Sequence, residues 1–345
     1  MFSKSIVSLQ FAAVGIDFLP GFTNTGYMYR KIVLLVILSL SGPLCFSQKT
    51  DTLAKKLDSM SREPDRSKNR KDLDINKTDY TARTNITPKT YFVLLATDMS
   101  QEVTGPFHAQ GKTWGKVGGF VLLEGGLLFA DKAIQKNSQI FMAHNPGAHN
   151  VSQYVTDFGA MYEVYTLAAF GAYGVIFKSN KVKTTTLLAT QSYIAAGAMS
   201  WTVKFLVGRR RPNSFTPENE NNLVFTGPMF KGGNSSFGSS FVSGHTTAAF
   251  SAATVFAEEY HDEILIPVIA YSAATLVGVS RITQNAHWAT DVFAAAALGY
   301  VTGKQVVFNY HRYARLEMNK QHKVTMFFNL QYNEGVIMPG MVCRF

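Results

Sequence analysis

Residues 184–203, TTTLLATQSYIAAGAMSWTV, are 20 consecutive residues without a formal charge, and Lys204 follows them directly. A stretch of about 20 such residues is as long as a membrane-spanning helix or a long core helix. The small residues at 195–198 allow neighbouring helices to pack closely. The run therefore predicts a helix that ends in a cation.

Five further blocks share this low charge, and most of them are also rich in small residues: 118–130, 164–177, 246–257, 264–279 and 288–303. Glycine-containing turns separate the blocks. We therefore expect an all-α fold, a bundle of about six main helices. The charged motifs described below would lie at helix ends and face one end of that bundle.

Whether this bundle lies in a membrane depends on how apolar the blocks are. Only 184–203 reaches about 20 residues without a charge, because Glu124 and Asp131 interrupt or end the block at 118–130. The mean hydropathy of +0.02 is low for a chain that mostly faces lipid. We favour an exported helical domain of the bacterial cell envelope, periplasmic or membrane-associated. The alternative is an integral membrane bundle.

The N-terminal residues indicate export. Arg30 and Lys31 precede a short apolar core at 32–40, which is the pattern of a secretory signal peptide with cleavage after Ser47 or Gln48. Translation would then start at Met28, and the residues before it form an unassigned upstream extension.

Composition divides the chain further. The segment 49–90 is polar and charged, as expected for a mobile leader. In the tail, apolar runs flank a turn at Asn333-Glu-Gly335, which predicts a β-hairpin. The predicted organisation is an extension and signal peptide at 1–48, a leader at 49–90, a helical domain at 91–315 and a tail at 316–345.

The formal net charge is +10 and the pI about 9.4. The basic residues are spread through the leader and the tail without the interleaved aromatic side chains of a nucleic-acid-binding face. We therefore expect no nucleic-acid partner. The charge favours an anionic membrane surface or a phosphorylated substrate.

Three short segments concentrate chemistry on apolar surroundings: Lys204 to Pro212, Ser243-Gly-His245 and Ser280 to Asp291. The first and third supply one ammonium and two guanidinium groups, from Lys204, Arg211 and Arg281, which suit the several oxygens of a phosphate. The Ser243 hydroxyl and the Gly244 backbone N–H complete such a cradle. This set predicts a phosphate-binding pocket.

Two histidines suit the two chemical roles of phosphate ester cleavage. One attacks phosphorus, and the other protonates the departing alkoxide. Asp291 lies four residues after His287, so on one helix the two share a face. A carboxylate on one ring nitrogen would fix the tautomer and leave the other nitrogen as the nucleophile.

These residues resemble the type 2 phosphatidic acid phosphatases, a superfamily that includes class A acid phosphatases and vanadium haloperoxidases. The family pattern is K-x6-R-P, then P-S-G-H, then S-R-x5-H-x3-D. Lys204 with Arg211-Pro212 fits the first block, and Ser280, Arg281, His287 and Asp291 fit the third. Val242 stands where the second block usually has proline. The resemblance covers about residues 115–310.

The resemblance implies a role for each position. His287 would be the nucleophile, oriented by Asp291, and His245 the general acid and then the base that activates water. The residues that would bind the phosphoryl oxygens are Lys204, Arg211, Ser243, Gly244 and Arg281. Arg209 would support these residues or line the entrance. The scheme needs no metal or other cofactor.

Each motif alone has a simpler explanation. Arg209 to Arg211 would usually be a solvated basic run, His287 a core or helix-end histidine, and Ser243-Gly-His245 a small-residue turn. Independent matches at fixed spacing favour the functional interpretation. The remaining histidines have no partners at metal-ligand spacing, and His144 to His149 is interpreted as a loop. They are His108, His144, His149, His261, His311 and His322.

The leading hypothesis is a metal-independent phosphatase that cleaves phosphate monoesters or lipid (di)phosphates through a phosphohistidine. The alternative is a vanadate-dependent haloperoxidase with the same oxyanion pocket, and vanadate would then be the cofactor. A third possibility is a pseudoenzyme that only retains the fold. The residues choose neither among lipid and small soluble substrates nor an oligomeric state. The loop part from Phe225 to Phe241 is expected to shape the entrance.

Overall fold

The computed structural model describes residues 84–108, 111–215, 239–319, 325–333 and 336–344, with Lys55, Leu57, Tyr80, Phe225 and Gly227 as single positions. The chain divides into units 1–50 and 51–345, and every described residue belongs to the second. The predicted extension and signal peptide, most of the leader and most of the loop at 225–241 therefore lie outside the described residues.

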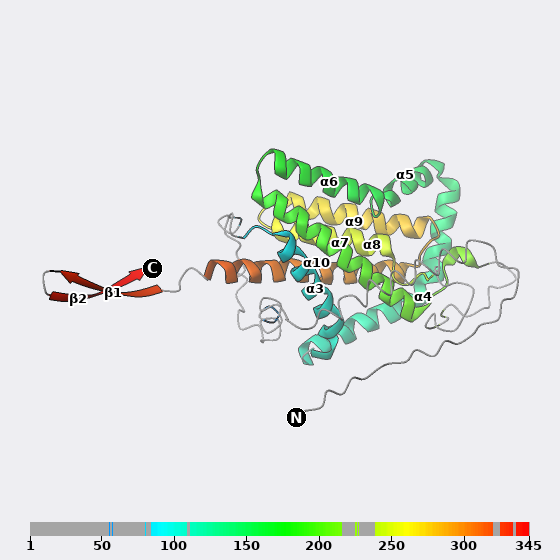
Figure 1. The fold of residues 1–345 in the computed structure, drawn as a ribbon. Coiled ribbons are helices and arrows are strands. Elements are labelled where there is room, and N and C mark those ends of the chain that lie inside the picture. The colour runs from blue at the N-terminus through cyan, green and yellow to red at the C-terminus, as the bar shows by residue number, and fades with distance from the viewer. Residues whose placement is uncertain are drawn as a thin grey trace, which may run out of the picture. The chain divides into compact units, whose positions relative to one another are not determined.

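Eight α-helices occur among the described residues, so the expected all-α class is confirmed (Figure 1). They are α3 (Pro88–Thr104), α4 (Gly111–His144), α5 (Pro146–Asp157), α6 (Met161–Ile176), α7 (Asn180–Val207), α8 (Gly244–Glu259), α9 (Leu265–Thr283) and α10 (Ala289–Asn319). Short 3₁₀ turns lie at Gly105–His108 and Pro212–Ser214. Almost all of each of the six apolar blocks lies within one helix, and α3 and α5 are additional.

The sequence explains where several helices begin and end. Ser179 caps the start of α7, because its side chain accepts from the Val182 N–H. Gly208 ends α7 with φ 56°, a left-handed conformation that glycine adopts at little cost. The loop expected at His144 to His149 is wrong. Only Asn145 separates α4 from α5, because Pro146 occupies the first turn of α5, where a missing N–H costs nothing.

Helix α8 packs against α7, α9 and α10 (Figure 1). Its contact with α10 is close because α10 presents glycines to it. A Cβ on Gly299 would lie 2.4 Å from the Thr247 carbonyl oxygen, and one on Gly303 would lie 2.5 Å from the Ser251 carbonyl oxygen. These glycines let the first half of α8 pack closely against α10, and the starts of both helices carry candidate site residues.

Part of the predicted leader packs on the bundle. Leu57 is fully buried in a hydrophobic cluster that includes Leu94, Leu188 and Val306, and Tyr80 packs against the same cluster. The Tyr80 hydroxyl also donates to the Glu259 carboxylate. The polar composition of the leader concealed these two anchors.

Many large apolar side chains of the bundle are exposed, and α9 is the clearest case. Among the described residues, it is the one helix long and apolar enough to cross a membrane, and 28% of its most apolar window is buried. Leu265, Ile269 and Leu276 are each more than half exposed.

The tail contains two strands, β1 (Thr325–Asn333) and β2 (Val336–Arg344), which pair antiparallel with Asn333 opposite Val336. Their side chains lie outside the described set. Helix α10 continues to Asn319, past the expected boundary at 315.

Candidate active site

The structure brings the three sequence motifs together at the ends of four helices. Lys204 lies in the last turn of α7, and Arg211 follows the helix. His245 begins α8, and Arg281 lies in the last turn of α9. The candidate nucleophile His287 and its neighbour Asp291 lie between α9 and α10 and in the first turn of α10.

His287 is 1% exposed, and its hydrogen bonding defines its tautomer. Its Nδ1 lies 2.8 Å from the carbonyl oxygen of Ser240. A carbonyl oxygen only accepts hydrogen bonds, so Nδ1 carries the proton. Burial lowers the pKa of His287 to about 4, so the ring is neutral at pH 7. The lone pair of the neutral ring is therefore on Nε2.

Asp291 touches His287 but is not its main hydrogen-bond partner. Asp291 Oδ2 lies 3.6 Å from His287 Nδ1, farther than the Ser240 carbonyl oxygen. The same oxygen accepts from the Ser240 hydroxyl and from the Trp288 N–H at 2.8 Å. Burial raises the pKa of Asp291, but contact with His287 and the charge of Arg209 outweigh this and hold the pKa below its ordinary value.

Arg209 is buried behind this pair and holds the carboxylate from the other side. Its Nη1 donates to Asp291 Oδ1 at 2.6 Å, and its Nη2 donates to Asp131 Oδ2 on α4 at 2.7 Å. Its guanidinium carbon lies 4.9 Å from the Phe225 ring centroid and 5.4 Å from the Trp288 ring centroid. Arg209 is 3% exposed. It therefore supports Asp291 and does not line an entrance.

Lys204 lies against the start of α8. A Cβ on Gly244 would be 3.4 Å from the Lys204 ammonium nitrogen, so glycine lets the ammonium approach the backbone. Burial and the neighbouring charge of Arg211 lower the pKa of Lys204 to about 8. Nearby negative charge does not balance the Lys204 ammonium, so this position favours the binding of an anion.

Arg281 is 8% exposed and is held by α5 and by its own helix end. Its Nη1 donates to Thr156 at 3.5 Å and to Gln284 at 3.1 Å. The Thr156 and Ser280 hydroxyls lie 2.8 Å apart, which fixes α5 against the end of α9. Helix α5 therefore orients a candidate phosphate-binding residue.

His245 has a different environment from His287. Burial and then the positive charge of Arg281 lower the pKa of His245 to about 4. Three further groups act in the same direction: His287, Lys204 and Arg211. A Cβ on Gly159 would lie 2.9 Å from His245 Cβ, so the turn before α6 covers one side of this histidine.

Ser243 is fully buried at the start of α8. Its hydroxyl accepts from Thr246 at 2.9 Å, and its N–H donates to the Asp291 carbonyl oxygen at 3.2 Å. The peptide bond before Val242, the position where the family has proline, is cis.

Sequence reasoning missed Asp131 and Ser240. Asp131 was noted only as the charge that ends an apolar block, although a lone carboxylate there is itself a sign of a buried pair. Ser240 has no motif of its own, and its roles depend on a backbone carbonyl. Among the other histidines, His311 is buried with Glu259 at 2.8 Å. The described residues contain no group of three or more metal-ligand side chains.

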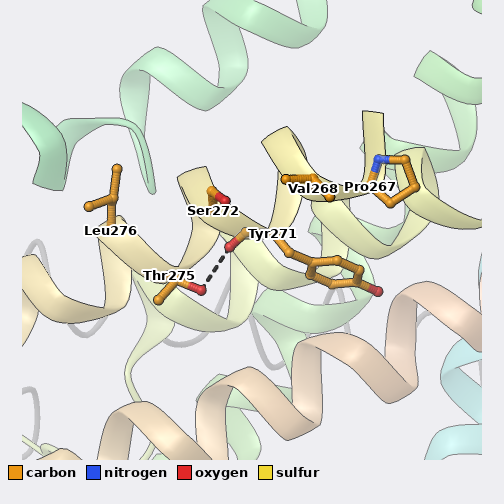
Figure 2. Close-up of a pocket in the computed structure, with 6 residues that line it drawn as sticks. All are labelled: Pro267, Val268, Tyr271, Ser272, Thr275 and Leu276. Atoms are coloured by element: carbon orange, nitrogen blue, oxygen red, sulfur yellow. Dashed lines mark hydrogen bonds between the residues drawn. The ribbon is translucent and has the colours of Figure 1, made fainter. Parts of the chain in front are cut away.

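An apolar pocket of about 640 Å³ lies on α9, apart from the candidate site residues (Figure 2). It is lined by Pro267, Val268, Tyr271, Ser272, Thr275 and Leu276. Figure 2 shows the Tyr271 ring lying along the helix, and its hydroxyl donates to Thr254 of α8 at 3.2 Å.

Comparisons with known proteins give a family model, a curated relative and two solved structures. The family model of the PAP2 superfamily matches residues 185–315. A lipid A 1-phosphatase from Porphyromonas gingivalis is 38% identical over 92 residues, which cover 24% of this chain and 21% of that protein. The chain thus spans about a fifth of the length of this curated relative.

Two crystal structures are similar at low identity. A transmembrane PAP2 type phosphatidylglycerolphosphate phosphatase from Bacillus subtilis has a TM-score of 0.40 at 20% identity, covering 56% of this chain and 92% of that one. LpxE from Aquifex aeolicus has a TM-score of 0.38 at 22% identity, covering 52% and 94%. Both TM-scores are too low to support a conclusion. Residues 185–315, which contain all three motif blocks, are thus similar to the PAP2 superfamily.

Proposed function

We propose that the chain is a phosphatase that hydrolyses the phosphate monoester or diphosphate of a lipid through a phosphohistidine on His287. The observation that carries the proposal is the state of that residue. Its Nδ1 proton is held by the Ser240 carbonyl oxygen, so a neutral ring offers the Nε2 lone pair. The charges of Arg281 and Lys204 act on the same ring.

In the first step, His287 Nε2 forms a bond to phosphorus, and the bond from phosphorus to the ester oxygen breaks. His245 donates a proton to the departing oxygen. In the second step, His245 takes a proton from water, the water oxygen bonds to phosphorus, and the bond to Nε2 breaks. The products are inorganic phosphate and an alcohol from a monoester, or inorganic phosphate and a lipid monophosphate from a diphosphate, and both histidines return to their starting states.

The cations give this scheme its substrate dependence. In the free protein burial, and then these cations, lower the pKa of His245 to about 4. A bound phosphate dianion neutralises part of the charge of Lys204 and Arg281 and so raises that pKa toward its ordinary value. His245 would thus gain its proton only when a phosphate is present, which couples the general acid to substrate binding.

Two observations support a lipid substrate at a membrane surface. The curated relative is named a lipid A 1-phosphatase. Helices of the bundle also expose large apolar side chains, among them Leu122 and Phe129 of α4 and Ile269 of α9. We propose that this exposed apolar surface, including the α9 pocket, lies against lipid, and that the net charge of +10 favours an anionic membrane.

The test is release of inorganic phosphate by the purified full chain from p-nitrophenyl phosphate, phosphatidate and an isoprenyl diphosphate, without added metal. His287→Ala should abolish turnover. His245→Ala should still form a phosphoenzyme slowly with the good nitrophenolate leaving group. His144→Ala is the matched control, because His144 is exposed and bonds only to Ile140 of its own helix among the described contacts.

A phosphoenzyme that is stable in alkali and labile in acid would identify phosphohistidine. Wild-type turnover in His287→Ala would refute the assigned nucleophile. Absence of phosphate release together with vanadate-dependent bromide oxidation would replace the phosphatase by the haloperoxidase alternative.

A further inference from the structure

Helix α4 contributes a carboxylate to the back of the site, although it carries none of the three motifs. The Asp131 side chain is 4% exposed. Its Oδ1 accepts from the Thr290 N–H at 3.0 Å, and its Oδ2 accepts from the Thr290 hydroxyl at 2.6 Å and from Arg209 at 2.7 Å. Asp131 therefore binds the first turn of α10 and Arg209 at once.

Arg209 continues this connection to Asp291. Its Nη1 donates to Asp291 Oδ1 and to the Thr290 hydroxyl, each at 2.6 Å. The guanidinium has little freedom, because Phe225 and Trp288 lie close to it. The Asp291 carboxylate is then fixed by Arg209 at one oxygen and by Ser240 and Trp288 at the other.

The charges of Asp131, Arg209 and Asp291 together favour a positive charge on the His287 ring. Two carboxylates and one guanidinium sum to one negative charge. Attack on phosphorus turns neutral His287 into a phosphorylated cationic ring, which one nearby negative charge stabilises. Without the Asp131 charge, Arg209 neutralises more of the Asp291 charge, and the ring gains less stabilisation as it becomes cationic.

We propose that Asp131 is a positioning residue for phosphoryl transfer, which acts through Arg209 to hold the Asp291 carboxylate and its negative charge beside His287. This inference rests on the proposed phosphohistidine mechanism. The competing explanation is structural: a carboxylate at the start of α10 also stabilises the helix. The positioning role predicts that loss of the Asp131 charge weakens stabilisation of the transition state, whereas the structural role predicts only a less stable fold.

The test compares Asp131→Asn with Gln135→Ala. Gln135 lies one turn later on α4 and also supports the segment before α10, through a 2.7 Å bond to Asn285, but it is uncharged. For each protein, kcat and KM for p-nitrophenyl phosphate, and inhibition by phosphate and by vanadate, are measured. Phosphate reports ground-state binding, and vanadate mimics the trigonal-bipyramidal transition state bonded to Nε2.

Residues that orient a reacting group without touching the substrate contribute about 10- to 100-fold to activity. Asp131→Asn should lower kcat by this factor and weaken inhibition by vanadate by a similar factor. Inhibition by phosphate and KM should stay within about twofold of the wild-type values. Gln135→Ala should keep the wild-type preference for vanadate over phosphate. An unchanged vanadate preference in folded Asp131→Asn would overturn the inference, whatever happens to its melting temperature.

If Asp131→Asn does not fold, Arg209→Lys tests the same connection. Lysine keeps the positive charge but has one nitrogen in place of the two that donate separately to Asp131 and Asp291. A folded Arg209→Lys with the wild-type vanadate preference would overturn the inference. Absence of phosphohistidine in the wild type would instead mean that the proposed function fails.

Discussion

The low pKa of Lys204 predicts where activity is lost in alkali. Burial and the charge of Arg211 place this pKa at about 8. A phosphate monoester is a dianion above its second pKa of about 6, so the substrate does not titrate at higher pH. The charged fraction of Lys204 falls from about nine-tenths at pH 7 to about one-tenth at pH 9. If the ammonium binds the phosphoryl group, kcat/KM falls about tenfold over this range.

Lys204→Arg separates this ammonium from other causes of alkaline loss, because a guanidinium stays protonated at any pH at which the protein is folded. The variant should lose activity at pH 7, since the ammonium lies close to the Gly244 backbone and a guanidinium differs from it in size and geometry. A hydrogen bond to a charged group contributes about 1.5–3 kcal/mol, so the expected loss is roughly 10- to 150-fold. Between pH 7 and pH 9 its kcat/KM should nevertheless fall about tenfold less than that of the wild type, because the substitution removes only the titration of Lys204.

The assay is the pH profile of kcat/KM for p-nitrophenyl phosphate, with the pH dependence of phosphate affinity by calorimetry as a second measure that needs no turnover. The shape of the profile shows whether Lys204 causes the alkaline loss, because a poor fit of arginine lowers kcat/KM equally at every pH. An alkaline limb near pH 8 in both proteins would show that another group titrates. It would refute the assignment of Lys204 to the phosphate.

Two further predictions concern packing and location. Gly299→Ala should destabilise the fold by about 1–3 kcal/mol, because its Cβ would meet Thr247 and Phe250. Gly197→Ala is the matched control, because its new Cβ meets nothing within 4 Å. This variant should be as stable as the wild type or more stable in thermal unfolding. Equal effects of the two substitutions would contradict the close α8–α10 contact. The exposed apolar face of α9 predicts that the full chain stays with membranes in alkaline carbonate and is released by detergent. Recovery in the carbonate supernatant would exclude insertion into lipid.

The helices were predictable because local composition determines them. Each low-charge block lies almost entirely within one helix, and the residue types at 204–212, 243–245 and 280–291 were sufficient to expect a phosphate pocket at helix ends. The structure places all three segments at such ends. Helix α5 was missed because Pro146 and Gly147 are typical of a loop, although proline also suits the first turn of a helix.

The support behind the nucleophile was not predictable in the same way. The sequence spacing of Asp291 and His287 indicated a direct carboxylate contact with the ring, and the spacing does bring them within 3.6 Å. The closer partner, the Ser240 carbonyl oxygen, is a backbone group that no residue type announces. Asp131 lies 78 positions from Arg209, so only the packing of α4 reveals the pair.

The arrangement of charge explains why the nucleophile needs both sides of the site. On one side of His287 lie the carboxylates of Asp291 and Asp131, which Arg209 joins. The charges of Lys204 and Arg281 also act on the ring, and they lower its pKa. In the proposed reaction, the phosphoryl oxygens bind these cations, and the ring becomes positive next to the carboxylates. Burial, together with these cations, keeps His287 neutral in the free protein. The same separation of cations from carboxylates then stabilises the charges formed during transfer.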